Sequence, residues 1–339
     1  MACVQFCAAV GLVSSSSRIV PWVSFKMCAS RETIISAGYD EDVTIVSIGE
    51  ILWDLFPDSE RLGGATFNFS VHARRCGHEV IFLSAVGKDA RGERARRRAI
   101  ELGLHGEFIQ SVDEAETGSV AVKVDASGHP DFTLRRPAAY DRLCIGAAAL
   151  SQIVSMEPQW IYYGTLHQIY DHTLQETRRL IRALPGARKF YDVNLRRDCY
   201  SPELLWGLMK QSDVVKLNDD EASEIDRLAG RSPGSLAEFT AHWAEAMGWQ
   251  AVAVTRGAKG YVVRIGNEYA ESSPYLIKVA DTVGAGDSFS AAFLHGLANG
   301  WDAAKCGDFA NRVGALVASK AGGVPDWTME EVWALYDME

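Results

Sequence analysis

The sequence lacks the marks of several special classes of protein. Its seven cysteines form no CxxC pair, and its eight histidines show no metal-ligand spacing. No stretch is both apolar enough and long enough to span a membrane. These absences predict free thiols, no structural metal, no membrane contact and a cytoplasmic location.

Positive charge is also scarce. There are 34 Lys and Arg against 44 Asp and Glu, which gives a formal net charge of −10 at pH 7. This balance argues against a surface built to hold nucleic acid phosphates. The densest basic run extends from Arg91 to Arg98, and we interpret it as an exposed, solvated helix face.

Acidic residues are missing from the beginning of the chain, where none occurs between Met1 and Arg31 and where a serine run stands in VSSSSRIV. This composition weakly resembles an organelle transit peptide, and an overlong start with Met27 as a later initiator explains it equally well. We therefore expect residues 1–42 to be a poorly ordered or targeting extension and residues 43–339 to form the folded domain.

Beyond this extension, short apolar segments alternate with helical patterns. The predicted strands are VTIVSIG (43–49), EVIFLSAVG (79–87), WIYYG (160–164), KFYDVN (189–194), DVVKLN (213–218) and AVAVTRG (251–257). Strands that alternate with helices predict an α/β fold whose mostly parallel sheet is covered on both faces. In such sheets, ligands bind beyond the carboxyl ends of the strands.

One region departs from this alternation. Between about 107 and 136, TGSVAVKVD and PDFTLRR indicate successive strands with a turn at 125–129. Together with about 54–62, this region predicts a small antiparallel β sheet, either a lid over the ligand site or an edge extension of the main sheet. The apolar residues Val120, Val122 and Val124 on this sheet suggest a homodimer formed through the lid.

The stretch VADTVGAGDSFSAAFLHGL (279–297) places small residues directly ahead of an apolar helix. At Gly284, Ala285 and Gly286, backbone N–H groups and the positive end of the helix dipole could bind a phosphate. Asp287 is then either an ordinary N-cap or first-turn acid, or a general base for a hydroxyl that attacks a phosphoryl group. The run of small residues favours the base, because a simple cap does not need it.

A second glycine junction stands in RLGGATFNFS (61–70), where Gly63 and Gly64 precede a helix with Asn68 in its first turn. Glycines would let a sugar approach the backbone, while Asn68 and Asp54 bind its hydroxyls. A tight strand-to-helix turn with Asn68 as a cap is the alternative.

Two further strand ends carry polar residues. In KLNDDEASEI, Asn218 and Glu221 fit a capping box, and they equally suit the positioning of magnesium and phosphate through water. In DVNLRRD, Asp192, Asn194 and Arg196 project from a strand end. Arg196 either neutralises phosphate charge or forms a surface ion pair.

Together these motifs resemble the ribokinase (PfkB) family of carbohydrate kinases. DTVGAGDSFSAAFLHG matches the C-terminal signature of the family, and the segment from GG at 63–64 through VGKDARG at 86–92 matches its N-terminal pattern. Within the family, bacterial fructokinases are the most similar branch, on GEILWDLFP, GGATFNFSVHARRCG, RRPAAYD, DVNLRRDCYS and VVKLNDDE. The resemblance covers Val43 to Trp327 and implies a ribokinase-like three-layer sandwich with a small β lid.

The resemblance also implies an activity and a set of roles. The activity is transfer of the γ-phosphate of ATP to a primary hydroxyl of a sugar, with fructose as the first expected substrate, Mg²⁺ as cofactor and K⁺ as an optional activator. The implied roles are catalytic base for Asp287; anion hole for Gly284, Ala285 and Gly286; substrate binding for Asp54, Gly63, Gly64, Asn68 and Arg196; magnesium and phosphate positioning for Asn218 and Glu221; nucleotide binding for Thr255, Gly257, Gly260 and Asn311; and monovalent cation binding for Asp281.

One departure from the fructokinase pattern concerns the sugar. GGATFN carries Thr66 and Phe67 where fructokinases commonly show a proline and a small or aliphatic residue, so we expect a reshaped sugar pocket. A kinase for 2-keto-3-deoxygluconate or ribose is therefore an alternative, and a catalytically silent, kinase-like regulator is a second one. The intact GAGD argues against silence. A dinucleotide-binding oxidoreductase is disfavoured, because no GxGxxG follows VTIVSIG.

Overall fold

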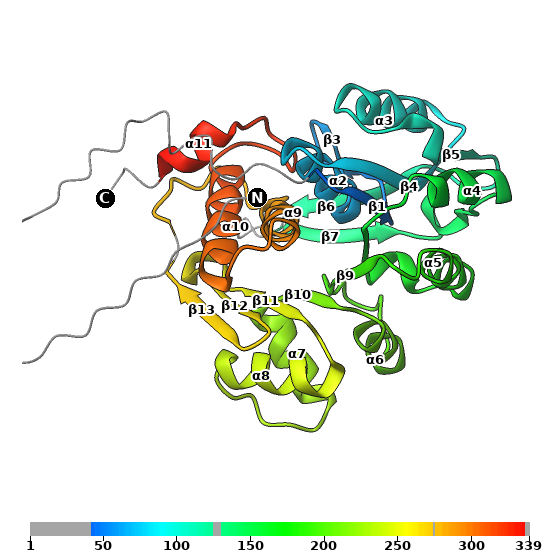
Figure 1. Cartoon of the computed structure of the whole chain (residues 1–339). Coiled ribbons are helices and arrows are strands. Elements are labelled where there is room, and N and C mark those ends of the chain that lie inside the picture. Colours follow the sequence, from blue (N-terminus) through cyan, green and yellow to red (C-terminus); the bar gives the residue numbers. More distant parts are fainter. Residues whose placement is uncertain (1–41, 125–129, 274, 336–339) are drawn as a thin grey trace, which may run out of the picture. The chain divides into compact units, whose positions relative to one another are not determined.

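The computed structural model describes residues 42–124, 130–273 and 275–335 (Figure 1). Within these ranges, the side chains are described except at residues 122–124 and 130–132. The predicted N-terminal extension, including the alternative start at Met27, lies outside the described residues. In the described part of the chain, no helix combines the length and the apolar character needed to cross a membrane.

The described elements alternate much as the sequence predicted. The strands are β1 (Thr44–Ile48), β2 (Leu52–Leu55), β3 (Glu60–Gly63), β4 (Glu79–Gly87), β5 (Ile109–Val112), β6 (Gly118–Val124), β7 (Pro130–Arg135), β8 (Trp160–Gly164), β9 (Arg188–Asp192), β10 (Val214–Asn218), β11 (Ala251–Thr255), β12 (Tyr261–Ile265) and β13 (Glu268–Ser272). The helices are α2 (Ala65–Arg75), α3 (Ala90–Glu101), α4 (Ala147–Ser155), α5 (Asp171–Ala183), α6 (Pro202–Lys210), α7 (Asp219–Leu228), α8 (Leu236–Met247), α9 (Ala285–Ala298), α10 (Ala303–Ala318) and α11 (Met329–Ala334).

The main sheet has nine strands in the order β13-β12-β11-β10-β9-β8-β1-β4-β5. The seven strands from β11 to β5 are parallel, and β12 and β13 add an antiparallel edge. The prediction of a mostly parallel sheet is therefore confirmed. Because β8 to β11 run in one direction, their carboxyl ends meet at one edge of the sheet, where the ligand site of such folds lies.

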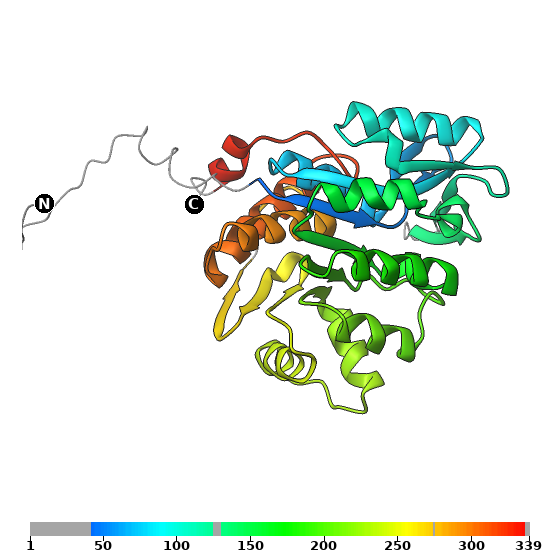
Figure 2. The same cartoon turned by 45° about the vertical axis from the view of Figure 1, so that its right-hand side comes forward.

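Helices cover both faces of this sheet (Figures 1 and 2). On one face, apolar side chains of α2, α3, α9, α10 and α11 pack into a single core cluster. On the other face, α4, α5, α6, α7 and α8 contribute to a second cluster. The strands between them are apolar on both faces, as a fully covered parallel sheet requires.

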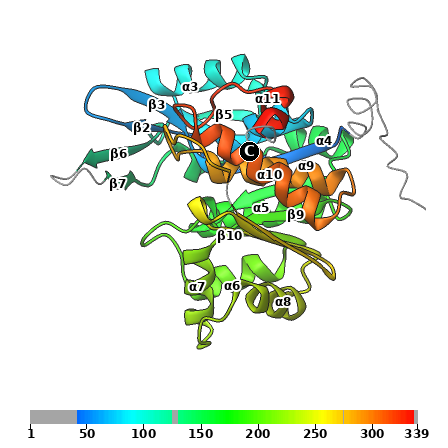
Figure 3. The ribbon, with the colours of Figure 1, turned by 90° about the vertical axis from the view of Figure 1, so that its left-hand side faces the viewer.

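A second sheet of four strands has the order β3-β2-β6-β7, and its strands lie together at one side of Figure 3. It differs from the predicted small antiparallel sheet in one pairing, because β2 and β6 run parallel. The predicted boundary at 107 also needs correction. Strand β5 pairs with β4 at the edge of the main sheet. It begins directly after the short helical turn that follows α3, and this turn brings the chain to that edge.

The suggestion that apolar residues of this sheet are exposed for a partner is not supported at Val120. Its side chain is only 8% exposed, because it packs against Leu52, Ala138 and Tyr140. The side chains of Val122 and Val124 lie outside the described residues. The homodimer remains a prediction.

Candidate active site

The GAGD motif begins helix α9. Gly284 is the N-cap residue, with φ of 80° in the left-handed region that glycine favours. A Cβ atom at this position would lie 2.1 Å from the carbonyl oxygen of Gly323, so only glycine fits. Asp287 is thus not the N-cap residue but an acid of the first turn, beside the backbone N–H groups that have no partner within the helix.

The carboxylate of Asp287 faces helix α2. Nδ2 of Asn68 donates a hydrogen bond of 2.8 Å to Oδ2 of Asp287, which joins residues 219 positions apart. Burial and the nearby Asp192 raise the pKa of Asp287 to about 7, against the lowering effects of Asn68, Lys216 and Arg196. An acid with this pKa exchanges its proton near neutral pH.

The beginning of helix α2 is shaped by glycine and by a buried acid. Gly64 is its N-cap residue at φ of 111°, and a Cβ atom there would lie 2.7 Å from the carbonyl oxygen of Glu50. The Glu50 carboxylate accepts the backbone N–H of Ala65 at 2.9 Å and so replaces an N-cap side chain. Burial raises the pKa of Glu50. This arrangement orients the helix that carries Asn68.

Arg61 of the second sheet stands opposite Asp54 and forms an ion pair with Asp281. Asp54 faces Arg61 in the register of β2 and β3, and burial raises the pKa of Asp54 to about 6. Nη1 of Arg61 lies 2.8 Å from Oδ2 of Asp281, whose two oxygens also accept the backbone N–H groups of Gly322 and Val283. Arg61 therefore balances the charge of Asp281 in this structure, and monovalent cation binding at Asp281 stays a prediction.

Asn218 and Glu221 form a capping box at the beginning of α7. Each side chain accepts the backbone N–H of the other residue at 2.8 Å, and the second oxygen of Glu221 accepts the N–H of Leu195 at 2.7 Å. Burial raises the pKa of Glu221, against the attraction of Lys216. In the described residues, no three acidic, His or Cys side chains gather as a metal site. The water-mediated contact of Glu221 with magnesium stays a prediction.

Three of the residues predicted to bind the nucleotide lie at or after the carboxyl end of β11, the strand that neighbours β10. Thr255 ends β11 directly opposite Asn218 of β10, and Gly257 and Gly260 flank the turn that leads to β12. Gly260 has φ of 85°, and a Cβ atom there would lie 2.0 Å from the carbonyl oxygen of Ser272. Asn311 of α10 donates to the carbonyl oxygen of Ser273, which follows β13, at 3.3 Å.

Arg196 follows β9 and is exposed. In the described part of the chain, no carboxylate lies within ion-pair distance of its guanidinium, which disfavours the surface ion pair that the sequence left open. Its positive charge lowers the pKa of Glu50, Asp54 and Asp287, although burial outweighs it in each case. Arg196 therefore acts electrostatically on the acids of both glycine junctions.

Sequence reasoning missed Lys216, which lies in the middle of the apolar strand β10. Its Nζ atom is 3.2 Å from Oδ1 of Asp192, and both side chains are buried. A signal for this pair was available. A lysine in an otherwise apolar, fully covered strand needs a partner, and Asp192 holds the corresponding position on the neighbouring strand β9.

An influence of Thr66 and Phe67 on the sugar pocket stays a prediction. Both are buried, with Thr66 against Glu50 and Phe67 against the ring of Phe82 in the core. These positions of α2 point into the protein, while Asn68 points toward Asp287.

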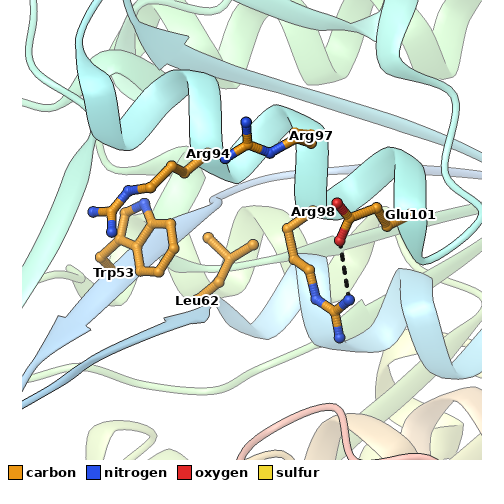
Figure 4. A pocket seen from close by; sticks show the side chains of 6 residues that line it. All are labelled: Trp53, Leu62, Arg94, Arg97, Arg98 and Glu101. Carbon is orange, nitrogen blue, oxygen red and sulfur yellow. Dashed lines mark hydrogen bonds and ion pairs between the residues drawn. The ribbon is translucent and has the colours of Figure 1, made fainter.

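The arginine-rich helix α3 borders a different hollow. Figure 4 shows Trp53 and Leu62 of the second sheet facing Arg94, Arg97 and Arg98. The guanidinium of Arg94 lies 4.6 Å from the centre of the Trp53 ring. None of the predicted site residues lines this pocket. Its arginines are exposed, as predicted for this helix face, and Arg94 ties α3 to the second sheet through Glu60 and Trp53.

Comparison with known proteins shows the family of this chain. Residues 44–329 match the pfkB family carbohydrate kinases. The chain belongs to the PfkB family. As a member, it is a sugar kinase, a phosphotransferase whose acceptor is an alcohol group.

Its relatives within the PfkB family include fructokinases. A relative from Pyrococcus horikoshii, whose name describes it as a sugar kinase, is 28% identical over 299 residues. These residues are 82% of this chain and 91% of the relative. A fructokinase from Salmonella typhimurium is 28% identical over 264 residues, which are 74% of this chain and 83% of that protein.

A solved structure confirms the fold. The fructokinase with bound ATP from Xylella fastidiosa superimposes with a TM-score of 0.74 at 23% identity, and it covers 87% of this chain and 98% of its own. The predicted ribokinase-like α/β fold with a second, small sheet is therefore confirmed.

Proposed function

We propose that this PfkB kinase transfers the γ-phosphate of ATP to a primary hydroxyl of fructose and forms fructose 6-phosphate. The arrangement of Asp287 carries the proposal. A carboxylate with a pKa near neutrality lies in the first turn of a glycine-initiated helix and is held by Asn68 from the other glycine junction. The fructokinase relatives support the choice of sugar, and the ATP-bound relative supports the donor.

In this mechanism, Asp287 accepts the proton of the sugar hydroxyl. The hydroxyl oxygen forms a bond to the γ-phosphorus, the bond between that phosphorus and the bridging oxygen breaks, and ADP leaves. The N–H groups of Gly284, Ala285 and Gly286 stabilise charge on the transferring group. A base whose pKa is about 7 suits this task, because it is largely ionised above neutral pH and still holds a proton well.

The sugar binds at the glycine junction of Gly63 and Gly64. Asp54 and Asn68 bind sugar hydroxyls, Gly63 and Gly64 allow the sugar to approach the backbone, and Arg196 offsets phosphate charge. The second sheet, which carries Asp54, closes over the sugar and excludes water that would otherwise hydrolyse ATP.

The nucleotide lies beyond the carboxyl ends of β10 and β11. The residues proposed to hold it are Thr255, Gly257, Gly260 and Asn311. Magnesium, when bound, offsets the charge of the β- and γ-phosphates. Glu221 would hold it through water, and Asn218 fixes Glu221 through the capping box.

The first test measures ADP release with ATP and magnesium against fructose, glucose, ribose, 2-keto-3-deoxygluconate and adenosine. We expect turnover chiefly with fructose. Turnover chiefly with another sugar would make that sugar, and not fructose, the substrate. ATP binding without any sugar-dependent ADP release favours the silent regulator.

The second test separates a base from an ordinary helix acid. Asp287→Asn should lower kcat at least about 100-fold, because no group then takes the hydroxyl proton. Asp302→Asn is the matched control, since Asp302 caps the neighbouring helix α10 by accepting the N–H of Lys305 at 2.8 Å. If both variants keep wild-type kcat, Asp287 is not the base.

A further inference from the structure

Below the anion hole lies an ion pair that the mechanism so far does not use. Lys216 of β10 is 6% exposed and Asp192 of β9 is 1% exposed. The two residues stand directly opposite each other in the register of these parallel strands. Nζ of Lys216 lies 3.2 Å from one carboxylate oxygen of Asp192 and 3.3 Å from the other.

Asp192 is held on two further sides. Its Oδ2 atom accepts hydrogen bonds from the Tyr162 hydroxyl of β8 at 3.1 Å and from the Ser290 hydroxyl of α9 at 2.8 Å. The carboxylate therefore joins three elements of the sheet and helix α9. It keeps its two hydroxyl donors even when the lysine is removed.

The ammonium of Lys216 also reaches the first turn of α9. A Cβ atom built on Gly286 would lie 3.1 Å from Nζ of Lys216. This contact is tighter than nine in ten real Cβ contacts, so glycine at 286 leaves room for the ammonium. Gly286 belongs to the proposed anion hole and directly precedes Asp287.

We propose that Lys216 is a positioning residue of phosphoryl transfer, whose ammonium, fixed by Asp192 beneath Gly286, keeps Asp287 in the ionised form that accepts a proton. This inference rests on the proposed role of Asp287 as the base. The lysine acts through Asp287 and the backbone of Gly286 and does not itself take part in bond making.

The charges around Asp287 explain why a lysine is needed. The groups that face it are Asp192 of β9, Lys216 of β10, Tyr162 of β8 and Arg196 after β9, with the Asn68 amide of α2 as its hydrogen-bond donor. Without the ammonium, Asp192 and Asp287 would be two close carboxylates, and such a pair retains one proton. Two hydroxyls donate to Asp192 and one amide donates to Asp287, so the retained proton goes to Asp287.

The experiment compares pH profiles of kcat/KM for the sugar that the wild-type enzyme uses. Lys216→Met should move the acid limb to higher pH and lower kcat at neutral pH at least about ten-fold. Asp192→Asn should move the acid limb to lower pH, because a negative neighbour of Asp287 is lost while the lysine stays. Damage to packing alone would not produce shifts of opposite sign.

Lys189→Met is the matched control. Lys189 pairs with Asp213 at 2.7 Å and links the same strands at their opposite ends, away from α9. We expect its pH profile and kcat to equal those of the wild type. Lys216→Arg, which keeps the charge, should retain the wild-type acid limb.

An unchanged acid limb in Lys216→Met, or shifts of the same sign in Lys216→Met and Asp192→Asn, overturns the inference. If Lys216→Met does not fold, the Asp192→Asn profile decides, and an unshifted limb there overturns it. Failure of the proposed function is recognised separately, because the wild type then lacks fructose turnover or Asp287→Asn retains activity.

Discussion

Asp287 occupies a position where its charge costs stability. Burial and Asp192 raise its pKa from 3.8 to about 7, so the folded protein holds this proton more tightly than the unfolded chain does. The folded state therefore loses stability as the pH rises from about 3.8 to about 7. Activity and stability place opposite demands on this residue, because the base must be ionised.

A prediction follows for Asp287→Asn. The variant has no carboxylate to ionise, while its side-chain oxygen can still accept the hydrogen bond from Asn68. Its Tm should exceed that of the wild type by roughly 2 °C or more at neutral pH, and this advantage should shrink as the pH falls toward 3.8. Thermal unfolding across this pH range, with Asp302→Asn as the control, measures it. A Tm difference that does not change with pH contradicts the prediction.

At the residue scale, the sequence indicates which side chains can do chemistry better than it indicates what surrounds them. Asp287 and Asn68 are conspicuous beside their glycines, and the structure brings them within 2.8 Å of each other. The burial of Thr66 could not be predicted, because the direction of a helical side chain depends on how the helix is rotated against the sheet. Lys216 was overlooked, because its partner lies on another strand.

At the scale of elements, the anion hole depends on two segments that meet backbone to backbone. Helix α9 begins at Gly284 against Gly323, which lies in the segment between α10 and α11. His72 of α2 binds the same carbonyl oxygen of Gly323 at 2.9 Å and accepts the indole N–H of Trp327 at 3.0 Å. The C-terminal segment thus fixes the beginning of α9.

We therefore expect Gly284→Ala to damage catalysis more than stability alone explains. Both Gly284 and Gly300, which follows the same helix, have positive φ values of 80° and 64°, so alanine costs about 1–2 kcal/mol at either position. Only at Gly284 does a Cβ atom also meet backbone, whereas nothing lies within 4 Å of one at Gly300. Gly284→Ala should lower kcat about 100-fold, because the anion hole must shift.

Urea unfolding and steady-state kinetics on both variants test this expectation. Gly300→Ala should lose stability and keep its kcat. Equal kcat values for Gly284→Ala and the wild type would show that the contact with Gly323 does not set the geometry of the anion hole.

The sequence predicted elements better than their pairing. Short apolar runs between helical patterns identified β1, β4, β8, β9, β10 and β11, because fully buried strands are continuous apolar runs. The parallel pairing of β2 with β6 and the position of β5 at the edge of the main sheet depend on contacts between distant segments. Local patterns do not contain that information.

At the scale of the whole folded unit, charged side chains connect the second sheet to the main body. Glu60 of β3 accepts hydrogen bonds from Arg91 and Arg94 of α3. Arg61 of the same strand pairs with Asp281, in the loop that leads into α9. The basic run on α3 therefore helps hold the proposed lid, and Arg61 connects the lid to the loop that ends in the anion hole.

The last prediction concerns this connection. Arg61→Met should raise the KM for the sugar by up to about five-fold, because an exposed ion pair contributes up to about 1 kcal/mol and here stabilises the closed lid. The Tm should stay close to that of the wild type, since Asp281 keeps its bonds from Gly322 and Val283.

Lys88→Met is the control for Arg61→Met. It removes an exposed pair of similar length, 2.7 Å to Asp113, that does not involve the second sheet. Steady-state kinetics and thermal unfolding on the two variants decide the matter. A KM that rises equally in both would mean that loss of surface charge is responsible. A KM unchanged in Arg61→Met would mean that sugar binding does not depend on the tie between the lid and the loop before α9.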